Sequence, residues 1–126
     1  MKKLLLADAD PINSVVLQAA LAGEGYHVTA VHSLDDWNYA AHGKPFNLII
    51  MDETFLSISK HLFDLSKEAF KAFENTPIIV MTEYPELVEN RYRFPRKARF
   101  LLKPFQADEM FHMVRQIFFD GAVALA

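Results

Sequence analysis

The stretch Leu48-Ile49-Ile50-Met51-Asp52 decides the fold, because four consecutive apolar residues run directly into a carboxylate. A continuous apolar run of this length is typical of a strand that is buried on both faces, as in a parallel sheet covered by helices. Comparable apolar runs occur at residues 4–7, 28–31, 78–81 and 100–102. The sequence therefore predicts five short, buried, parallel strands.

Helical periodicity fills most of the intervals between these runs. Apolar residues recur at steps of three and four over residues 12–21, and similar patterns predict helices over 34–42, 59–73 and 107–119. The interval 83–97 is the least regular, because its prolines confine any helix to the residues between them. Strands that alternate with helices predict one α/β domain over residues 1–126, an open sheet with helices on both faces. Its core spans about 2–119, and 120–126 form a tail or the start of a linker.

Composition excludes several classes of protein. The chain has no cysteine, so disulfide frameworks, cysteine–zinc sites, thiol catalysis and iron–sulfur clusters are excluded. Its net charge of −3 argues against a basic nucleic-acid-binding domain. No apolar run approaches the roughly 20 residues of a membrane span, and the apolar start is too short for a signal peptide. We therefore expect a soluble cytoplasmic protein without membrane contact.

Four different polar residues follow the predicted strands: Asp8, Asp52, Thr82 and Lys103. The carboxyl ends of parallel strands meet at one edge of the sheet, where ligands bind in folds of this kind. Two neighbouring carboxylates suit Mg²⁺, which commonly takes one or two carboxylates together with waters and phosphate oxygens. A lysine and a threonine beside the metal are suited to hold the other oxygens of a phosphoryl group. The pattern predicts a site for phosphate on a carboxylate.

The stretches 4–8, 48–52, 77–82 and 103–105 together resemble the response-regulator receiver domain of two-component signalling. The resemblance covers residues 2–119, and the family occurs as single-domain chemotaxis regulators or at the front of longer regulators. It implies a flavodoxin-like, doubly wound, five-stranded parallel sheet with the strand order 2-1-3-4-5. It also implies a phosphoacceptor in signal transduction rather than an enzyme with turnover.

By this resemblance, Asp52 is the phosphoacceptor, which takes a phosphoryl group from the phosphohistidine of a histidine kinase or phosphotransfer protein. Asp8, Asp52 and the backbone carbonyl of Thr54 are the expected Mg²⁺ ligands. Lys103 is expected to pair with Asp52 and then with the phosphoryl group.

The resemblance also implies a switch that alters the binding of a downstream protein or effector domain. Thr82 is expected to bond a phosphoryl oxygen, and the rotamer of Phe100 is expected to follow it. Simple core packing is the alternative for Phe100. The family usually has a cis peptide bond at the position of Lys103-Pro104.

The chain departs from the family pattern next to the first predicted strand. Receivers normally carry two adjacent acidic residues there, whereas this chain has Ala7 before Asp8. Asp10-Pro11 is interpreted as a helix N-cap followed by a proline in the first turn, not as a metal site. We therefore expect weaker binding of Mg²⁺.

Two glutamates follow predicted site residues directly, Glu53 after Asp52 and Glu83 after Thr82. We expect both side chains to point into solvent, although Glu83 is also placed to crowd the site, repel phosphate or partly replace the missing acidic ligand. Residues 53–59 lack the Met-Pro and glycine of the family, and their apolar residues indicate an unusual loop or an interaction surface. These departures favour an alternative, a degenerate receiver that acts as a phosphorylation-independent interaction module. A flavin-binding protein of similar fold is disfavoured, because the strand ends offer carboxylates where a phosphate-bearing cofactor needs backbone donors.

Charge is distributed unevenly along the chain. Residues 1–90 contain six basic and thirteen acidic residues, whereas 91–126 contain seven basic and three acidic ones. The basic cluster consists of Arg91, Arg93, Arg96, Lys97 and Arg99. The resemblance makes 84–119 the face that meets a partner or forms a homodimer, so we expect the cluster to bind an acidic protein segment. A solvated charged face is the alternative, and direct nucleic-acid binding is not expected, because no recognition motif accompanies the charge.

Overall fold

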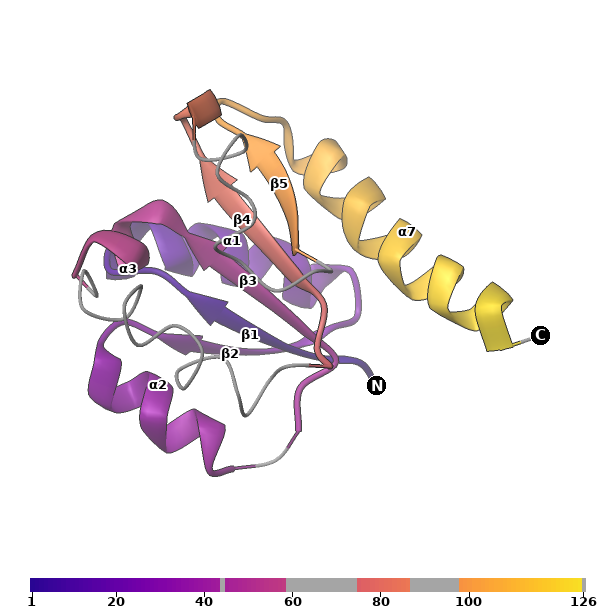
Figure 1. The fold of residues 1–126 in the computed structure, drawn as a ribbon, viewed down its shortest axis with the longest axis horizontal. Coiled ribbons are helices and arrows are strands. Elements are labelled where there is room, and N and C mark those ends of the chain that lie inside the picture. Colours follow the sequence, from indigo (N-terminus) through magenta and orange to yellow (C-terminus); the bar gives the residue numbers. More distant parts are fainter. Residues whose placement is uncertain (44, 59–74, 87–97, 126) are drawn as a thin grey trace.

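The structure is a computed structural model, and it describes residues 1–43, 45–58, 75–86 and 98–125. Five strands form one parallel sheet: β1 (Lys3–Ala7), β2 (His27–Val31), β3 (Leu48–Asp52), β4 (Ile78–Thr82) and β5 (Ala98–Leu102). Their order in the sheet is β2-β1-β3-β4-β5 (Figure 1). The predicted parallel sheet and its strand order are confirmed.

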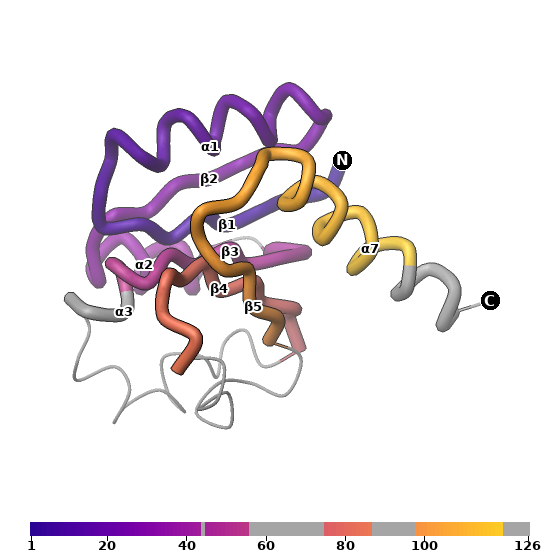
Figure 2. Tube along the Cα trace, turned by 90° about the horizontal axis from the view of Figure 1, so that it is seen from above, coloured from indigo at the N-terminus to yellow at the C-terminus, as the bar shows by residue number. Residues whose placement is uncertain are grey.

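Helices cover both faces of this sheet (Figure 2). They are α1 (Pro11–Gly23), α2 (Leu34–Ala41), α3 (Glu53–Ile58) and α7 (Ala107–Leu125). Helix α1 begins as the sequence predicts, because the side chain of Asp10 accepts a hydrogen bond from the Ile12 amide and a proline occupies the first turn. Helix α7 continues to Leu125, beyond the predicted end at Phe119. No helix in the described part of the chain is long and apolar enough to cross a membrane.

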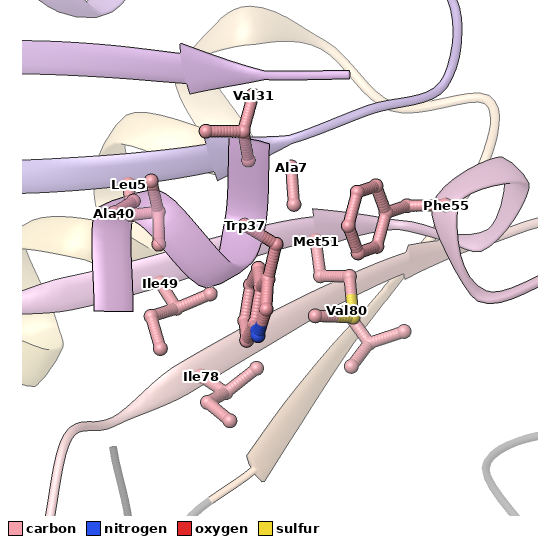
Figure 3. Packing of buried hydrophobic residues seen from close by; sticks show 10 residues of the cluster. All are labelled: Leu5, Ala7, Val31, Trp37, Ala40, Ile49, Met51, Phe55, Ile78 and Val80. Atoms are coloured by element: carbon pink, nitrogen blue, oxygen red, sulfur yellow. The ribbon is translucent and has the colours of Figure 1, made fainter. Parts of the chain in front are cut away.

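Alternating residues of the strands form two separate cores. On β1, Leu5 packs in the core under α2 and α3, whereas Leu4 and Leu6 pack in the core under α1 and α7. Successive side chains of a strand point to opposite faces, so a strand covered on both faces is apolar throughout. This arrangement explains the continuous apolar runs of the central strands β1, β3 and β4. The prediction that all five strands are buried is wrong for the edge strands β2 and β5, which are mostly half-buried because each has a neighbouring strand on one side alone. Figure 3 shows the first of the two cores, to which α2 contributes Trp37 and α3 contributes Phe55.

The structure corrects the interpretation of the segment after Asp52. Residues 53–58, predicted as part of a loop or interaction surface, form helix α3. Its Phe55 is fully buried, with its ring centroid 5.5 Å from that of Trp37 and the two rings inclined by 41°. The apolar side chain of Phe55 therefore serves the core and not a surface. The predicted helix over 59–73 lies outside the described residues, as do positions 87–97 of the irregular segment.

Candidate functional site

Parallel strand ends bring the four predicted polar residues to one edge of the sheet. Asp8, Asp52 and Thr82 are all buried there, with exposed fractions of 3%, 4% and 0%. Lys103 follows β5, and its backbone N–H donates to the Thr82 carbonyl over 2.8 Å. The sequence thus identified side chains that lie close together in space.

Asp52 and Lys103 form a direct ion pair. Lys103 Nζ lies 2.7 Å from Asp52 Oδ2, and the Asp52 side chain is 5% exposed against 29% for Lys103. Burial by itself lowers the pKa of the Lys103 ammonium, but the carboxylates of Asp52 and Glu53 outweigh burial and raise this pKa above its ordinary value. The lysine is therefore a stable cation at neutral pH.

The hydroxyl of Thr54 links the two aspartates. Thr54 Oγ1 lies 3.0 Å from Asp8 Oδ1 and 2.9 Å from Asp52 Oδ1. A hydroxyl has one proton to donate, so the two carboxylate oxygens converge on one position. Burial raises the pKa of Asp8, and the nearby charge of Asp52 raises it further, against the hydrogen bonds from the Asp10 amide and Thr54.

This donor set fits the Mg²⁺ expected from the resemblance to receiver domains. Two carboxylates whose oxygens meet at one position repel each other, and a divalent cation relieves this repulsion. The part of the chain that the structure describes holds no group of three or more His, Asp or Glu side chains placed for a metal. The remaining ligands would then be waters, phosphate oxygens and the predicted Thr54 carbonyl.

Glu53 enters the site, contrary to the expectation that its side chain points into solvent. Glu53 Oε2 accepts a hydrogen bond from the Thr82 hydroxyl over 2.6 Å and one from the Glu83 amide over 3.0 Å. Its other oxygen, Oε1, lies 3.5 Å from Lys103 Nζ. Glu83 itself is exposed, in agreement with the prediction for that residue. The three donors hold the Glu53 carboxylate inside the site.

Thr82 and Phe100 have different surroundings. The Thr82 hydroxyl donates to Glu53 and accepts from the Tyr84 amide over 3.0 Å. Phe100 is partly buried against the core under α2 and α3, and its role as a switch stays a prediction. The peptide bond between Lys103 and Pro104 is cis, as predicted.

Two features of this site were not predicted from the sequence. For Thr54, the prediction concerned its backbone carbonyl and not its hydroxyl. The side chain of Glu53 was expected in solvent and not inside the site. The acidic residue next to Asp52 was the only signal for the second. Of the basic cluster, Arg91, Arg93, Arg96 and Lys97 lie outside the described residues. Arg99 lies on β5, where its Nη1 donates to Gln116 Oε1 over 3.3 Å.

Neither a protein-family model nor a curated protein sequence matches the chain. Similarity to solved structures is extensive. A two-component response regulator from Clostridium difficile superposes with a TM-score of 0.76 and 18% identity, over 94% of this chain and 96% of that one. The chemotaxis protein CheY4 of Vibrio cholerae gives a TM-score of 0.77 and 21% identity, over 93% and 98% of the two chains.

The response regulator TrrA from Thermotoga maritima, solved in complex with Mg²⁺-BeF, gives a TM-score of 0.74. It is 22% identical to this chain, and the match covers 93% of this chain and 99% of that one. The superpositions establish the fold, whereas sequence identities this low do not establish the chemistry of the site. The chain has the flavodoxin-like fold of response-regulator receiver domains.

Proposed function

We propose that this domain accepts a phosphoryl group on Asp52 from the phosphohistidine of a histidine kinase or phosphotransfer protein. A carboxylate oxygen of Asp52 forms a bond to phosphorus as the bond between phosphorus and the donor's imidazole nitrogen breaks. The electron pair of the broken bond stays on the imidazole. The product is an acyl phosphate that carries about −1.5 to −2 units of charge. In this role the domain is a signalling phosphoacceptor without turnover of its own.

The ion pair between Asp52 and Lys103 carries this proposal. Asp52 is buried at the end of the central strand β3, and its contact of 2.7 Å with Lys103 Nζ places a cation where phosphate charge would develop. Thr82 offers a buried hydroxyl at the end of the adjacent strand. A carboxylate, a cation and a hydroxyl in this arrangement suit phosphoryl transfer onto the carboxylate.

The reaction is expected to depend on Mg²⁺, held by Asp8, Asp52 and the Thr54 carbonyl. When bound there, the ion would neutralise charge on the phosphoryl oxygens. The chain's own residues then orient Asp52, through Lys103 on one oxygen and Thr54 on the other. Ala7 replaces an acidic residue at this site, so binding of Mg²⁺ should be weaker than in receivers with two adjacent acidic residues.

Phosphorylation would act through Thr82 and Phe100 on the segment 83–99. A change there alters the face over 84–119, which we assign to a downstream protein or effector domain, or to a second copy of the chain. The basic cluster suits an acidic partner segment. Charge reversal at Arg99 should then weaken the complex and reduce its dependence on salt.

A small phosphodonor with Mg²⁺ tests the proposal directly. Intact-mass spectrometry should find an adduct of about 80 Da, the mass of one phosphoryl unit, which is absent from Asp52→Asn. Asp10→Asn is a matched control. Asp10 lies close to the site, but its carboxylate caps helix α1 and is not part of the proposed reaction. Failure to detect the adduct at saturating donor and metal would refute the phosphoacceptor function.

A specific observation favours the second candidate, a phosphorylation-independent interaction module. The Thr54 hydroxyl links the two carboxylates, and Glu53 takes the donors that a phosphoryl group would need. This candidate predicts that Asp52→Ala binds the partner with unchanged affinity. A partner that binds Asp52→Ala at least tenfold more weakly under phosphorylating conditions would exclude it.

A further inference from the structure

Three donors from two strand ends converge on the carboxylate of Glu53. They are the Thr82 hydroxyl at 2.6 Å, the Glu83 amide at 3.0 Å and the Lys103 ammonium at 3.5 Å. A hydroxyl, a backbone N–H and a cation form a complete set of donors for an oxyanion. We call this set the anion cradle.

The contact between Thr82 and Glu53 is well protected from water. The Thr82 side chain is fully buried, and the side chain of Glu53 is only 15% exposed. Both oxygens of Glu53 are used, because Oε2 accepts from Thr82 and Glu83 while Oε1 faces Lys103. Charge-assisted hydrogen bonds are roughly twice as strong as neutral ones, and partial burial strengthens them further.

The anion cradle lies directly beside Asp52. Lys103 Nζ is shared between Asp52 Oδ2 at 2.7 Å and Glu53 Oε1 at 3.5 Å. An oxyanion attached to Asp52 would therefore meet the same ammonium group that Glu53 already faces. Two anions that share one cation compete for it, and they also repel each other.

We propose that Glu53 is an internal ligand of the anion cradle, a tethered carboxylate that occupies the donors needed by a phosphoryl group on Asp52. If Asp52 is phosphorylated as proposed above, the side chain of Glu53 must first leave the cradle. This consequence rests on the proposed function. Until Glu53 leaves, the Thr82 hydroxyl is held by a carboxylate of the chain itself. Glu53 thus limits phosphoryl uptake and keeps the proposed switch residue engaged in the unmodified domain.

Glu83 provides a matched control for Glu53. Both glutamates stand at the same edge of the sheet, but the side chain of Glu83 is exposed and only its backbone N–H enters the cradle. Glu83→Gln removes the same charge and keeps that N–H. An effect of Glu53→Ala that is absent from Glu83→Gln therefore arises from the anion cradle. It does not arise from the overall negative charge at this edge of the sheet.

The first measurement requires no phosphodonor. Amide hydrogen exchange of residue 83, followed by NMR, reports the bond from this N–H to Glu53. In Glu53→Ala the exchange should become about tenfold faster, and in Glu53→Gln it should change less, because the amide oxygen still accepts. Glu83→Gln should exchange within about twofold of the wild type. Unchanged exchange in Glu53→Ala would show that Glu53 does not occupy the cradle, and would overturn the inference.

The second measurement compares uptake of the phosphoryl group from a small phosphodonor with Mg²⁺. Initial uptake by Glu53→Ala should exceed that of the wild type about tenfold, with Glu53→Gln in between and Glu83→Gln close to the wild type. If Glu53→Ala takes up the phosphoryl group no faster than the wild type, Glu53 does not compete with that group for the donors, and the inference fails. If Glu83→Gln is accelerated as much as Glu53→Ala, general charge explains the effect and the inference also fails.

The two measurements separate this inference from the proposed function. If no variant gains the added mass, the phosphoacceptor function fails. Faster exchange in Glu53→Ala would in that case still assign Glu53 as the permanent ligand of Thr82 and the Glu83 amide. Thermal unfolding of each variant verifies that the variants compared are folded.

Discussion

The hydroxyl of Thr82 donates to Glu53 Oε2 over 2.6 Å, and this bond joins the ends of two adjacent strands. Thr82 is the last residue of β4, and Glu53 directly follows β3. The bond is part of a continuous polar network that connects Asp8, Thr54, Asp52, Lys103, Glu53 and Thr82. In the described part of the chain, no buried side-chain nitrogen or oxygen lacks a hydrogen-bond partner.

Replacement of Asp8 by asparagine should stabilise the domain at neutral pH. Burial raises the pKa of Asp8, so the folded state holds its proton to a higher pH than the unfolded state does. Stability is therefore lost as the pH rises through the raised pKa, and the cost persists at pH 7. Asp8→Asn should gain about 1 kcal/mol there, measured by urea unfolding. The gain should shrink as the pH falls from the raised pKa of Asp8 to the ordinary aspartate pKa, and it should stay small below that value. A gain that is constant down to acidic pH would contradict the assignment.

A double-mutant cycle should reveal the coupling between Asp52 and Lys103. Lys103→Met leaves the buried carboxylate of Asp52 without its cationic partner and should cost about 2 kcal/mol of unfolding free energy at pH 7. Asp52→Asn removes that charge, so the double variant should lose about 1 kcal/mol less than the sum of the two single losses. Denaturant unfolding of the four proteins measures this difference. Strict additivity would mean that the contact of 2.7 Å does not contribute to stability.

The Lys103 pair should also show a defined pH dependence. The pKa of Lys103 is raised in the folded state, so its contribution is complete below the ordinary lysine pKa and is lost as the pH rises through the raised value. The difference in stability between the wild type and Lys103→Met should therefore stay constant between pH 6 and 9, about the range accessible to unfolding experiments, and fall only above it. A difference that falls already between pH 6 and 8 would contradict this sign.

Thr54→Val should destabilise the domain by about 1 to 2 kcal/mol. Valine preserves the shape of threonine, but it removes the donor to the two aspartates and the acceptor of the Ala9 amide. Thr29→Val on β2 is the matched control, because valine suits a half-buried strand position. Calorimetric unfolding of both variants measures the effect, and equal stability of the two variants would argue against a bridging role for the Thr54 hydroxyl.

Phe55→Ala should cost about 3 to 4 kcal/mol, the range for removal of a buried aromatic ring. The ring is fully buried against Trp37 at a centroid distance of 5.5 Å, so its removal leaves a cavity under α3. Tyr39→Ala, which removes a ring that is 85% exposed on α2, should stay within about 0.5 kcal/mol of the wild type. If the Phe55 variant were equally mild, residues 53–58 would be a surface segment, as the sequence pattern alone indicated.

The sequence by itself determined the sheet and the residues at its edge. Five apolar runs specified five strands, and the central strands β1, β3 and β4 are buried because a strand covered on both faces can be apolar at every position. Parallel strands end at one edge, so the residue after each run was enough to bring Asp8, Asp52, Thr82 and Lys103 together. Each of these patterns lies within a few consecutive residues, so it is visible in the sequence without knowledge of distant contacts.

Only the tertiary structure decided how the side chains next to these residues are oriented. Glu53 turns inward because Thr82 and Lys103 stand opposite it, 29 and 50 residues away along the chain. Phe55 is buried because Trp37 of α2 packs against it. Nothing within residues 53–58 records these partners, since a carboxylate or a ring favours solvent or the interior according to what faces it. The direction of Glu53, and with it the proposed regulation of the site, follows from contacts that form only once the strands are assembled.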